Sequence, residues 1–181
     1  MVKKMFAVSG VSLAMFFAFW GVFLGTKSSI FFTLGIVAMT ICYHFTIRLV
    51  IGGLFDYFLK NDVNYKREWF SERGFEKKLY KTLRVKKWKD YLPAADEDLF
   101  SLEKRTPVQV IKAGCQAEIV HECCAAAGLF SMFLAIPFGY FWVFFATSVA
   151  AALSDFLFVV IQRFNRPRLL KLIERKSAIK S

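Results

Sequence analysis

The sequence predicts an all-α, polytopic membrane protein with about four transmembrane helices and amphipathic helices at the cytoplasmic interface. Hydrophobic residues make up 56% of the chain and Phe occurs 22 times, more apolar content than the core of a soluble domain of this size requires. The apolar residues gather in runs of about 20, the length that crosses the hydrocarbon of a bilayer. Apart from Arg48 and Arg163, Lys and Arg lie before, between or after those runs. We therefore interpret residues 1–181 as a single membrane domain.

The first two spans are predicted at residues 5–25 and 30–50. A short polar stretch, "TKSS" (Thr26 to Ser29), separates them. The first run resembles a secretory signal peptide, but it is longer than a typical apolar region of that kind and has no small-residue cleavage site. It is therefore expected to remain as a helix, and "IGGLFDYFLK" is expected to extend the second helix into the interface.

The next segment, residues 60–115, is polar, aromatic and basic. From Lys60 to Ala117 the chain has 14 Lys or Arg against 9 Asp or Glu. Its apolar side chains recur at helical spacing, which predicts one membrane-facing side with lysines on the other. The predicted apolar side consists of Trp69, Phe70, Phe75, Leu79, Tyr80, Leu83 and Trp88.

The last two spans are predicted as a helical hairpin with arms at residues 116–136 and 140–163. The turn is placed at "IPFGY", because Pro and Gly mark turns. Pro167 restricts the residue before it and removes a backbone donor, which predicts a helix break near Asn165. Asn165 would then cap an amphipathic tail, residues 164–181, lying along the membrane.

The distribution of positive charge predicts the orientation of the chain. Two lysines precede the first span, 14 basic residues lie in the middle segment, and seven follow from Arg163 onward, whereas the two opposite turns hold only Lys27. The positive-inside rule therefore places both termini and the middle segment in the cytoplasm. A net charge of +11 on so apolar a chain favours anionic lipid headgroups as partners and disfavours nucleic acid.

Polar side chains inside the spans are costly and call for a function. Glu118 and His121 are three residues apart and share a helix face with Glu122 close by, a pattern that suits a carboxylate orienting a general base. Asp155 and Gln162 share a face of the fourth span. If the hairpin closes as predicted, the two groups meet near the cytoplasmic leaflet as one site. Equally open are a structural histidine at the headgroup level and an interhelical lock made by Asp155.

The basic residues Arg163, Arg166 and Arg168 end the fourth span. Forked guanidinium groups at a helix end suit a phosphate or carboxylate ligand, and the alternative is that they simply extend to the membrane surface. His44 and Arg48 form a second polar pair, which ranks below the hairpin residues. No metal, nucleotide or redox motif is present in the sequence, so no metal site and no bound cofactor is expected.

Three ordered blocks resemble the glycosyl-4,4'-diaponeurosporenoate acyltransferase family, membrane proteins of bacterial carotenoid synthesis. They are "RVKKWKDYLP" (Arg84 to Pro93), "AEIVH" (Ala117 to His121) and "IQRFNRPRL" (Ile161 to Leu169), with a weaker match at "FSERGFEKKLYK". The resemblance covers roughly residues 69–175. The family pattern usually has Glu and Arg where this chain has Ala113 and Gln116. In the last helix it often has an Asn followed by Pro, where this chain has Asp155 and Leu157.

The resemblance implies transfer of a fatty acyl group from a thioester such as acyl-CoA to a sugar hydroxyl of a membrane glycolipid, in a bacterial cytoplasmic membrane. The residues it implies for the site are Trp88, Lys89, Asp90, Glu118, His121, Gln162, Arg163, Asn165, Arg166 and Arg168. With the residue pattern, this gives Glu118, His121 and Asp155 as catalytic candidates and the others as substrate-binding candidates. Two alternatives remain: a non-catalytic lipid-binding or assembly subunit, and another lipid-modifying enzyme on the same scaffold. A homo-oligomer is also left open.

Overall fold

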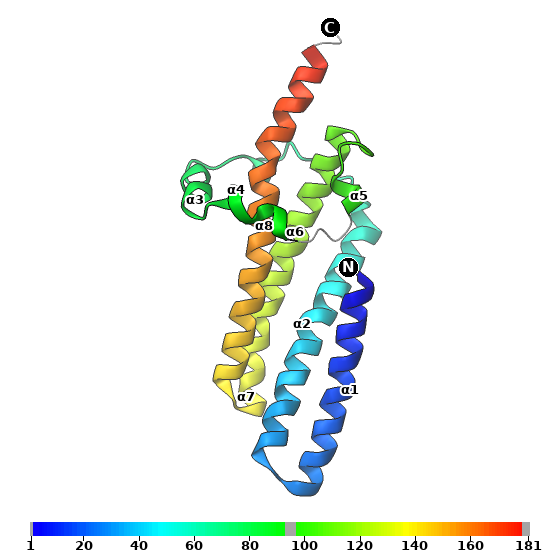
Figure 1. Cartoon of the computed structure of the whole chain (residues 1–181), viewed down its shortest axis with the longest axis vertical. Helices are drawn as coiled ribbons and strands as arrows, with labels where there is room; N and C mark the ends of the chain where they lie inside the picture. The colour runs from blue at the N-terminus through cyan, green and yellow to red at the C-terminus, as the bar shows by residue number, and fades with distance from the viewer. Residues whose placement is uncertain (1, 93–96, 179–181) are drawn as a thin grey trace. The chain divides into compact units, whose positions relative to one another are not determined.

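A computed structural model describes residues 2–92 and 97–178. Throughout those residues the regular structure is helical and contains no strand. Four helices are long and apolar enough to cross a membrane. They are α1 (Val2–Thr26), α2 (Ser29–Leu59), α6 (Pro107–Phe130), which continues through η3 (Ser131–Leu134) and α7 (Ala135–Phe138), and α8 (Phe141–Ala178). The predicted all-α fold with four such helices is confirmed (Figure 1).

The chain divides into two compact units. One combines residues 54–122 with 156–178, and the other combines residues 2–53 with 123–155. We refer to them as the basic unit and the apolar unit, after their composition. Helices α2, α6 and α8 each contribute residues to both units. That residues 1–181 form a single membrane domain stays a prediction.

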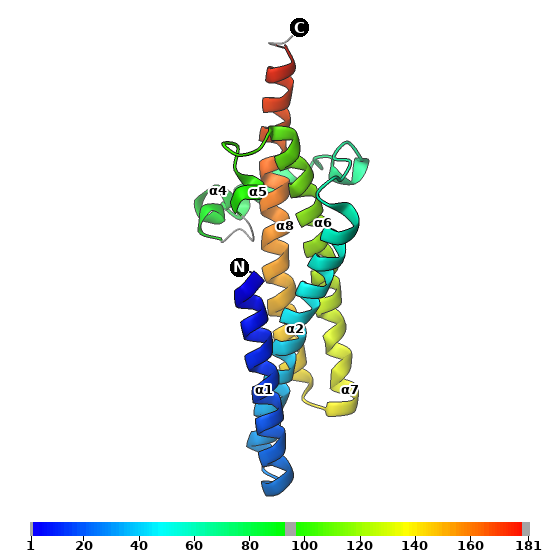
Figure 2. The same ribbon diagram turned by 90° about the vertical axis from the view of Figure 1, so that its right-hand side faces the viewer.

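In the apolar unit, α1 and α2 run antiparallel and side by side (Figures 1 and 2). A hydrogen bond of 2.6 Å joins Ser9 Oγ to Thr46 Oγ1 across this pair. Tyr43 Oη of α2 donates to the carbonyl of Ala127 at 2.8 Å. Such polar contacts matter between apolar helices, because lipid chains and apolar side chains differ too little to drive their association.

The turn before α8 needs a glycine. Gly139 has φ 71° and ψ −147°, a combination that is essentially restricted to glycine. The turn lies at Gly139 and Tyr140, which has φ 54°, at the end of the stretch Ile136 to Tyr140 where it was predicted. The helical segment α7 ends at Phe138, directly before it.

Replacing Gly139 with Ala is expected to lower the free energy of unfolding by about 1–3 kcal/mol, because a Cβ forces that backbone into strain. The measurement is thermal unfolding in detergent micelles. Gly25→Ala is the matched control, since no heavy atom lies within 4 Å of a Cβ at that helical position. Equal melting temperatures for the two variants would contradict the assignment of strain to Gly139.

The helix that contains the third predicted span begins before it. The span was predicted from residue 116, and α6 begins at Pro107. Thr106 Oγ1 accepts from the backbone N–H of Gln109 at 3.3 Å, and Gln109 Oε1 accepts from the N–H of Thr106 at 2.9 Å. This reciprocal pattern is a capping box with proline at the first helical position. The motif "TPVQ" therefore carried the signal for the helix start.

The predicted break near Asn165 is wrong. Helix α8 continues through Pro167 to Ala178, so Asn165 does not cap a separate tail helix. The side chains of Leu169, Leu170 and Ile173, beyond the proline, pack against a buried cluster in the basic unit. These contacts hold the helix together across a residue that lacks one backbone hydrogen bond.

The predicted single apolar side of the middle segment is also wrong. This segment forms the short helices η1 (Glu68–Phe70), α3 (Glu76–Thr82), α4 (Val85–Trp88), η2 (Lys89–Tyr91) and α5 (Glu97–Phe100). Phe70 and Tyr80 are buried inside the basic unit, whereas Trp69 and Phe75 are more than half exposed. The chain bends between the short helices, so residues that follow one helical period do not share one face.

Two buried apolar clusters support the basic unit. The first contains Val63, Phe70, Ile111 and Cys115. The second contains Tyr80, Val85 and Val160, with Trp88 and Phe164 packed against it. Phe70 and Tyr80 thus anchor residues 70–80 of the middle segment, each in one of the two clusters. Residues 70–80 are therefore fixed next to the polar side chains of α6 and α8.

Candidate active site

Glu118 of α6 is the most buried charged group of the basic unit, with a relative exposure of 0%. Arg163 Nε lies 2.8 Å from Glu118 Oε1, and Arg166 Nη2 is paired with Glu118 Oε2. The two arginines are three residues apart on α8, which puts them on one helix face. A buried carboxylate needs paired charge and hydrogen bonds. Here Oε2 accepts a hydrogen bond from Arg166, whereas Oε1 is ion-paired with Arg163 and has no hydrogen-bond partner in the described structure.

Glu76 of α3 supplies a second buried carboxylate. Arg163 Nη1 lies 2.5 Å from Glu76 Oε1, and Tyr80 Oη donates to Glu76 Oε2 at 2.7 Å. Burial raises the pKa of Tyr80, and the hydrogen bond to Glu76 raises it further. Glu76, Glu118, Arg163 and Arg166 carry two negative and two positive charges, so this Glu–Arg cluster is formally neutral.

The arginines also hold the middle segment against α8. Arg163 Nη2 donates to the carbonyl of Trp69 at 2.8 Å, and Arg166 Nη1 donates to the carbonyl of Phe70 at 2.8 Å. The guanidinium of Arg166 lies 4.9 Å from the centroid of the Phe70 ring, within the range of a cation–π contact. All three guanidinium nitrogens of Arg163 therefore have partners inside the protein.

His121 follows Glu118 by one turn of α6. Its ring is stacked on Phe158 of α8, with centroids 4.6 Å apart and ring planes at 9°. The side chain is half-buried. Next to it in sequence, Glu122 Oε2 accepts a hydrogen bond of 3.1 Å from Trp69 Nε1. The basic unit thus contains His121, the Glu–Arg cluster, and Trp69 and Phe70, which we call the Trp69 segment.

The glycosyl-4,4'-diaponeurosporenoate acyltransferase family matches residues 66–175, more than half of the 181 residues. The chain belongs to this family. No curated protein and no solved structure matches the chain. The match confirms the predicted family and segment, and it supports an acyltransferase role in carotenoid biosynthesis. Both carboxylates and both arginines of the Glu–Arg cluster, together with His121, lie inside the family segment.

Asp155, the third catalytic candidate, lies in the apolar unit and pairs with Arg48. Arg48 Nη2 is 2.5 Å from Asp155 Oδ2, and Arg48 Nε is 3.2 Å from Asp155 Oδ1. The same guanidinium donates to the carbonyls of His44 and Ala151, each at 3.1 Å. This bidentate pair joins α2 to α8, although Arg48 lies outside the family segment.

His44 is buried beside Arg48, and no hydrogen-bond partner for either ring nitrogen is found in the described structure. The ring lies against Gly128, where a Cβ would be 3.7 Å from His44 Nδ1. His44 and Arg48 were predicted as a polar pair that ranks below the hairpin residues, and the family resemblance does not extend to them. Only the helix packing of the apolar unit brings them next to Asp155.

The remaining candidate residues lie at the edges of the basic unit. Gln162 Oε1 lies beside Gly114, 3.1 Å from the position a Cβ would occupy. Trp88 Nε1 donates to the carbonyl of Leu83 at 2.8 Å. The guanidinium of Arg168 lies 4.6 Å from the centroid of Phe164 on an exposed part of α8. These contacts stabilise local structure.

Three further candidates lie on α8 and in η2. Asn165 and Lys89 are partly buried. Asp90 lies in η2, and its side chain falls outside the described part of the structure. In residues 2–92 and 97–178, no group of three or more His, Cys, Asp or Glu could hold a metal ion.

Sequence reasoning missed Glu76 and the structural use of Gln116. Glu76 lies in a basic helix, and its four-residue spacing from Tyr80 was the available signal. Gln116 is buried, accepts from the N–H of Asn61 at 2.8 Å, and donates to Asp56 Oδ1 at 2.7 Å. This position, where the family pattern usually has Arg, thus ties α6 to the end of α2 within the basic unit.

Proposed function

We propose that the protein is a membrane acyltransferase that moves a fatty acyl group from a thioester donor, such as acyl-CoA, to a sugar hydroxyl of a membrane glycolipid, as in glycosylated carotenoids. The family membership carries this proposal. The chain would lie in the bacterial cytoplasmic membrane as a multi-pass protein with both termini in the cytoplasm, as the distribution of Lys and Arg favours.

In the proposed reaction, His121 is the general base. Its imidazole takes the proton of the acceptor hydroxyl while that oxygen attacks the thioester carbonyl carbon. The C–S bond then breaks, and the proton passes from the imidazolium to the thiolate. The parallel stack on Phe158 fixes the plane of the imidazole. General-base help supplies about 10²–10⁴-fold, so positioning of the substrates must supply much of the rest.

Glu118 has a positioning role in this proposal. Because both of its oxygens face arginines, it holds Arg163 and Arg166, which in turn hold the Trp69 segment. The phosphates of the donor are then left to exposed basic side chains on α3, α4 and the turn between them. These are Lys77, Lys78, Lys81, Arg84, Lys86 and Lys87.

The test replaces His121 with Phe in the full chain. Phe keeps an aromatic ring for the stack on Phe158 but has no proton-accepting nitrogen. Transfer from acyl-CoA to a glycolipid is expected to fall by roughly 10²–10⁴-fold, measured as thiol release with mass spectrometry of the acylated product. Phe158→Leu, which removes the stack and keeps the imidazole, is expected to lose much less. Wild-type rates in the His121→Phe variant would eliminate the mechanism.

A second candidate is a non-catalytic lipid-binding or assembly subunit. The internal pairing of every Arg163 nitrogen favours it, because that arginine is already used to hold the fold. In this case the purified protein would retain a lipid and release no thiol from acyl-CoA. The assay of the wild-type protein therefore separates the two functions.

A further inference from the structure

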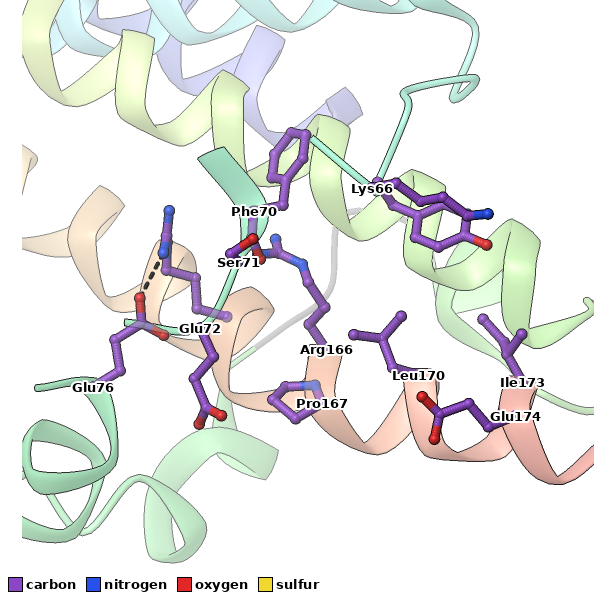
Figure 3. A pocket seen from close by; sticks show the side chains of 12 residues that line it. Lys66, Phe70, Ser71, Glu72, Glu76, Arg166, Pro167, Leu170, Ile173 and Glu174 are labelled. Carbon is purple, nitrogen blue, oxygen red and sulfur yellow. Dashed lines mark hydrogen bonds and ion pairs between the residues drawn. The ribbon is translucent and has the colours of Figure 1, made fainter. Parts of the chain in front are cut away.

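A pocket of about 420 Å³ opens in the basic unit between residues 65–76 and one face of α8. Pro167, Leu170, Ile173 and Glu174 line it from α8, and Figure 3 shows the middle segment across from them. Arg163 and Arg166, two of the predicted substrate-binding residues, also line the pocket. Its size suits the head of a lipid or a comparable small molecule.

The floor of the pocket is apolar and firmly supported. Phe70 is a buried member of the first apolar cluster, and Leu170, Ile173 and Tyr65 pack against that cluster. These four side chains also line the pocket. Pockets that bind small molecules commonly combine such a floor with a few polar groups that fix orientation.

The charges of the pocket disfavour an anionic ligand. Arg163 and Arg166 line it, but their charges are balanced by Glu76 and Glu118. The exposed polar side chains that remain at the rim are Lys66, Ser71, Glu72 and Glu174. Lys77 Nζ lies 3.6 Å from Glu72 Oε2, so two ammonium groups balance the two carboxylates and the rim has no net positive charge to attract a phosphate. Carboxylates readily accept hydrogen bonds from neutral hydroxyl groups.

We propose that this pocket binds the neutral sugar headgroup of the acceptor glycolipid, an inference that rests on the proposed function for its biological meaning. Glu72 and Glu174 accept hydrogen bonds from sugar hydroxyls, and Lys66 and Ser71 donate to sugar oxygens. The apolar floor contacts the C–H face of the ring. The donor's phosphates bind elsewhere, because the rim has no net positive charge.

The test is native mass spectrometry of the full chain titrated with glucosyl-diacylglycerol, the matched diacylglycerol and palmitoyl-CoA. The glucosylated lipid is expected to bind about tenfold more tightly than diacylglycerol. The double variant Glu72→Gln with Glu174→Gln is expected to lose most of that tenfold preference, since hydrogen bonds to charged groups are the stronger ones. Ser71→Trp, which fills the pocket mouth, is expected to abolish the preference.

Glu68→Gln is the matched control, because Glu68 is exposed on the same segment and does not line the pocket. It should keep the wild-type preference. Equal binding of the two lipids by the wild-type chain would overturn the proposal, as would an unchanged preference in both pocket variants. Competition of palmitoyl-CoA for the same site, strengthened by the two Gln substitutions, would assign the pocket to the donor and equally overturn it.

The experiments distinguish a wrong assignment of the pocket from a wrong assignment of the acyltransferase function. The His121→Phe variant is expected to bind the glucosylated lipid like the wild type. Binding without any thiol release by the wild-type protein would contradict the acyltransferase and support the pocket. Transfer with an unchanged KM for the acceptor in the pocket variants would overturn the pocket and leave the acyltransferase standing.

Discussion

Replacing Glu118 with Gln is expected to lower the free energy of unfolding by about 3–5 kcal/mol, because it leaves buried arginine charge without its partner. Glu118 is completely buried, and the side chains of Arg163 and Arg166 are 11% and 5% exposed. Gln has nearly the shape of Glu, so the loss reports charge rather than packing. Chemical unfolding in detergent micelles, followed by the fluorescence of the tryptophans, measures it.

Two further variants make this prediction specific. Glu68→Gln is the same chemical change at an exposed position, and it should leave the unfolding curve unchanged. The double variant Glu118→Gln with Arg166→Gln should be less destabilised than the sum of the two single variants, because the residues interact directly. Additive effects would show that Glu118 and Arg166 do not depend on each other for stability.

Loss of the Glu–Arg cluster should also release the middle segment. The carbonyls of Trp69 and Phe70 are held by Arg163 and Arg166, which are themselves held by Glu118. A Glu118 variant that still folds would therefore lose transfer activity through misplacement of this segment. Glu118 would then act as a positioning residue, and the pH dependence of the residual transfer should match that of the wild type.

Replacing Asp155 with Ala is expected to destabilise the apolar unit by a comparable amount, about 3–5 kcal/mol. Arg48 then remains in an apolar helix bundle without the carboxylate that it binds at 2.5 and 3.2 Å. Thermal unfolding of the purified protein in micelles measures the change. Ser154→Ala is the control next to it in sequence, because Ser154 is exposed and its hydroxyl bonds within its own helix.

The double replacement of Arg48 and Asp155 by Leu tests whether the pair is needed for stability at all. Replacing both members of a buried ion pair by apolar residues is often neutral or stabilising. The double variant should therefore be more stable than Asp155→Ala. If it also retains transfer, Asp155 is an interhelical lock, which was one of the two interpretations open from the sequence. Loss of transfer in a stable double variant would restore Asp155 as a catalytic candidate.

Helix identity in this protein follows from local sequence. An apolar run such as residues 5–25 has no other low-energy state in a membrane, because every backbone polar group must be satisfied within the helix. The glycine at the α7–α8 turn and the capping box at Thr106 are equally local signals. The capping box explains why α6 begins nine residues before the predicted third span.

The partners of the charged side chains do not follow from local sequence. Glu118 and Arg166 are 48 residues apart, and Arg48 and Asp155 are 107 residues apart. Helical spacing correctly groups Arg163 with Arg166 on one face, but it says nothing of what that face meets. The same limitation explains why the predicted helix break at Pro167 is wrong. Contacts of Leu170 and Ile173 with the buried cluster keep α8 continuous where local rules predict a break.

By itself, the sequence determined the all-α fold, the four apolar helices and the acyltransferase family, because these depend on composition, helical period and short ordered motifs. Only the tertiary structure decided that Arg163 and Arg166 neutralise buried carboxylates, that Asp155 pairs with Arg48, and that a pocket opens beside Leu170. The physical reason is that a charged side chain is defined by the groups around it, and folding brings those groups from distant parts of the chain.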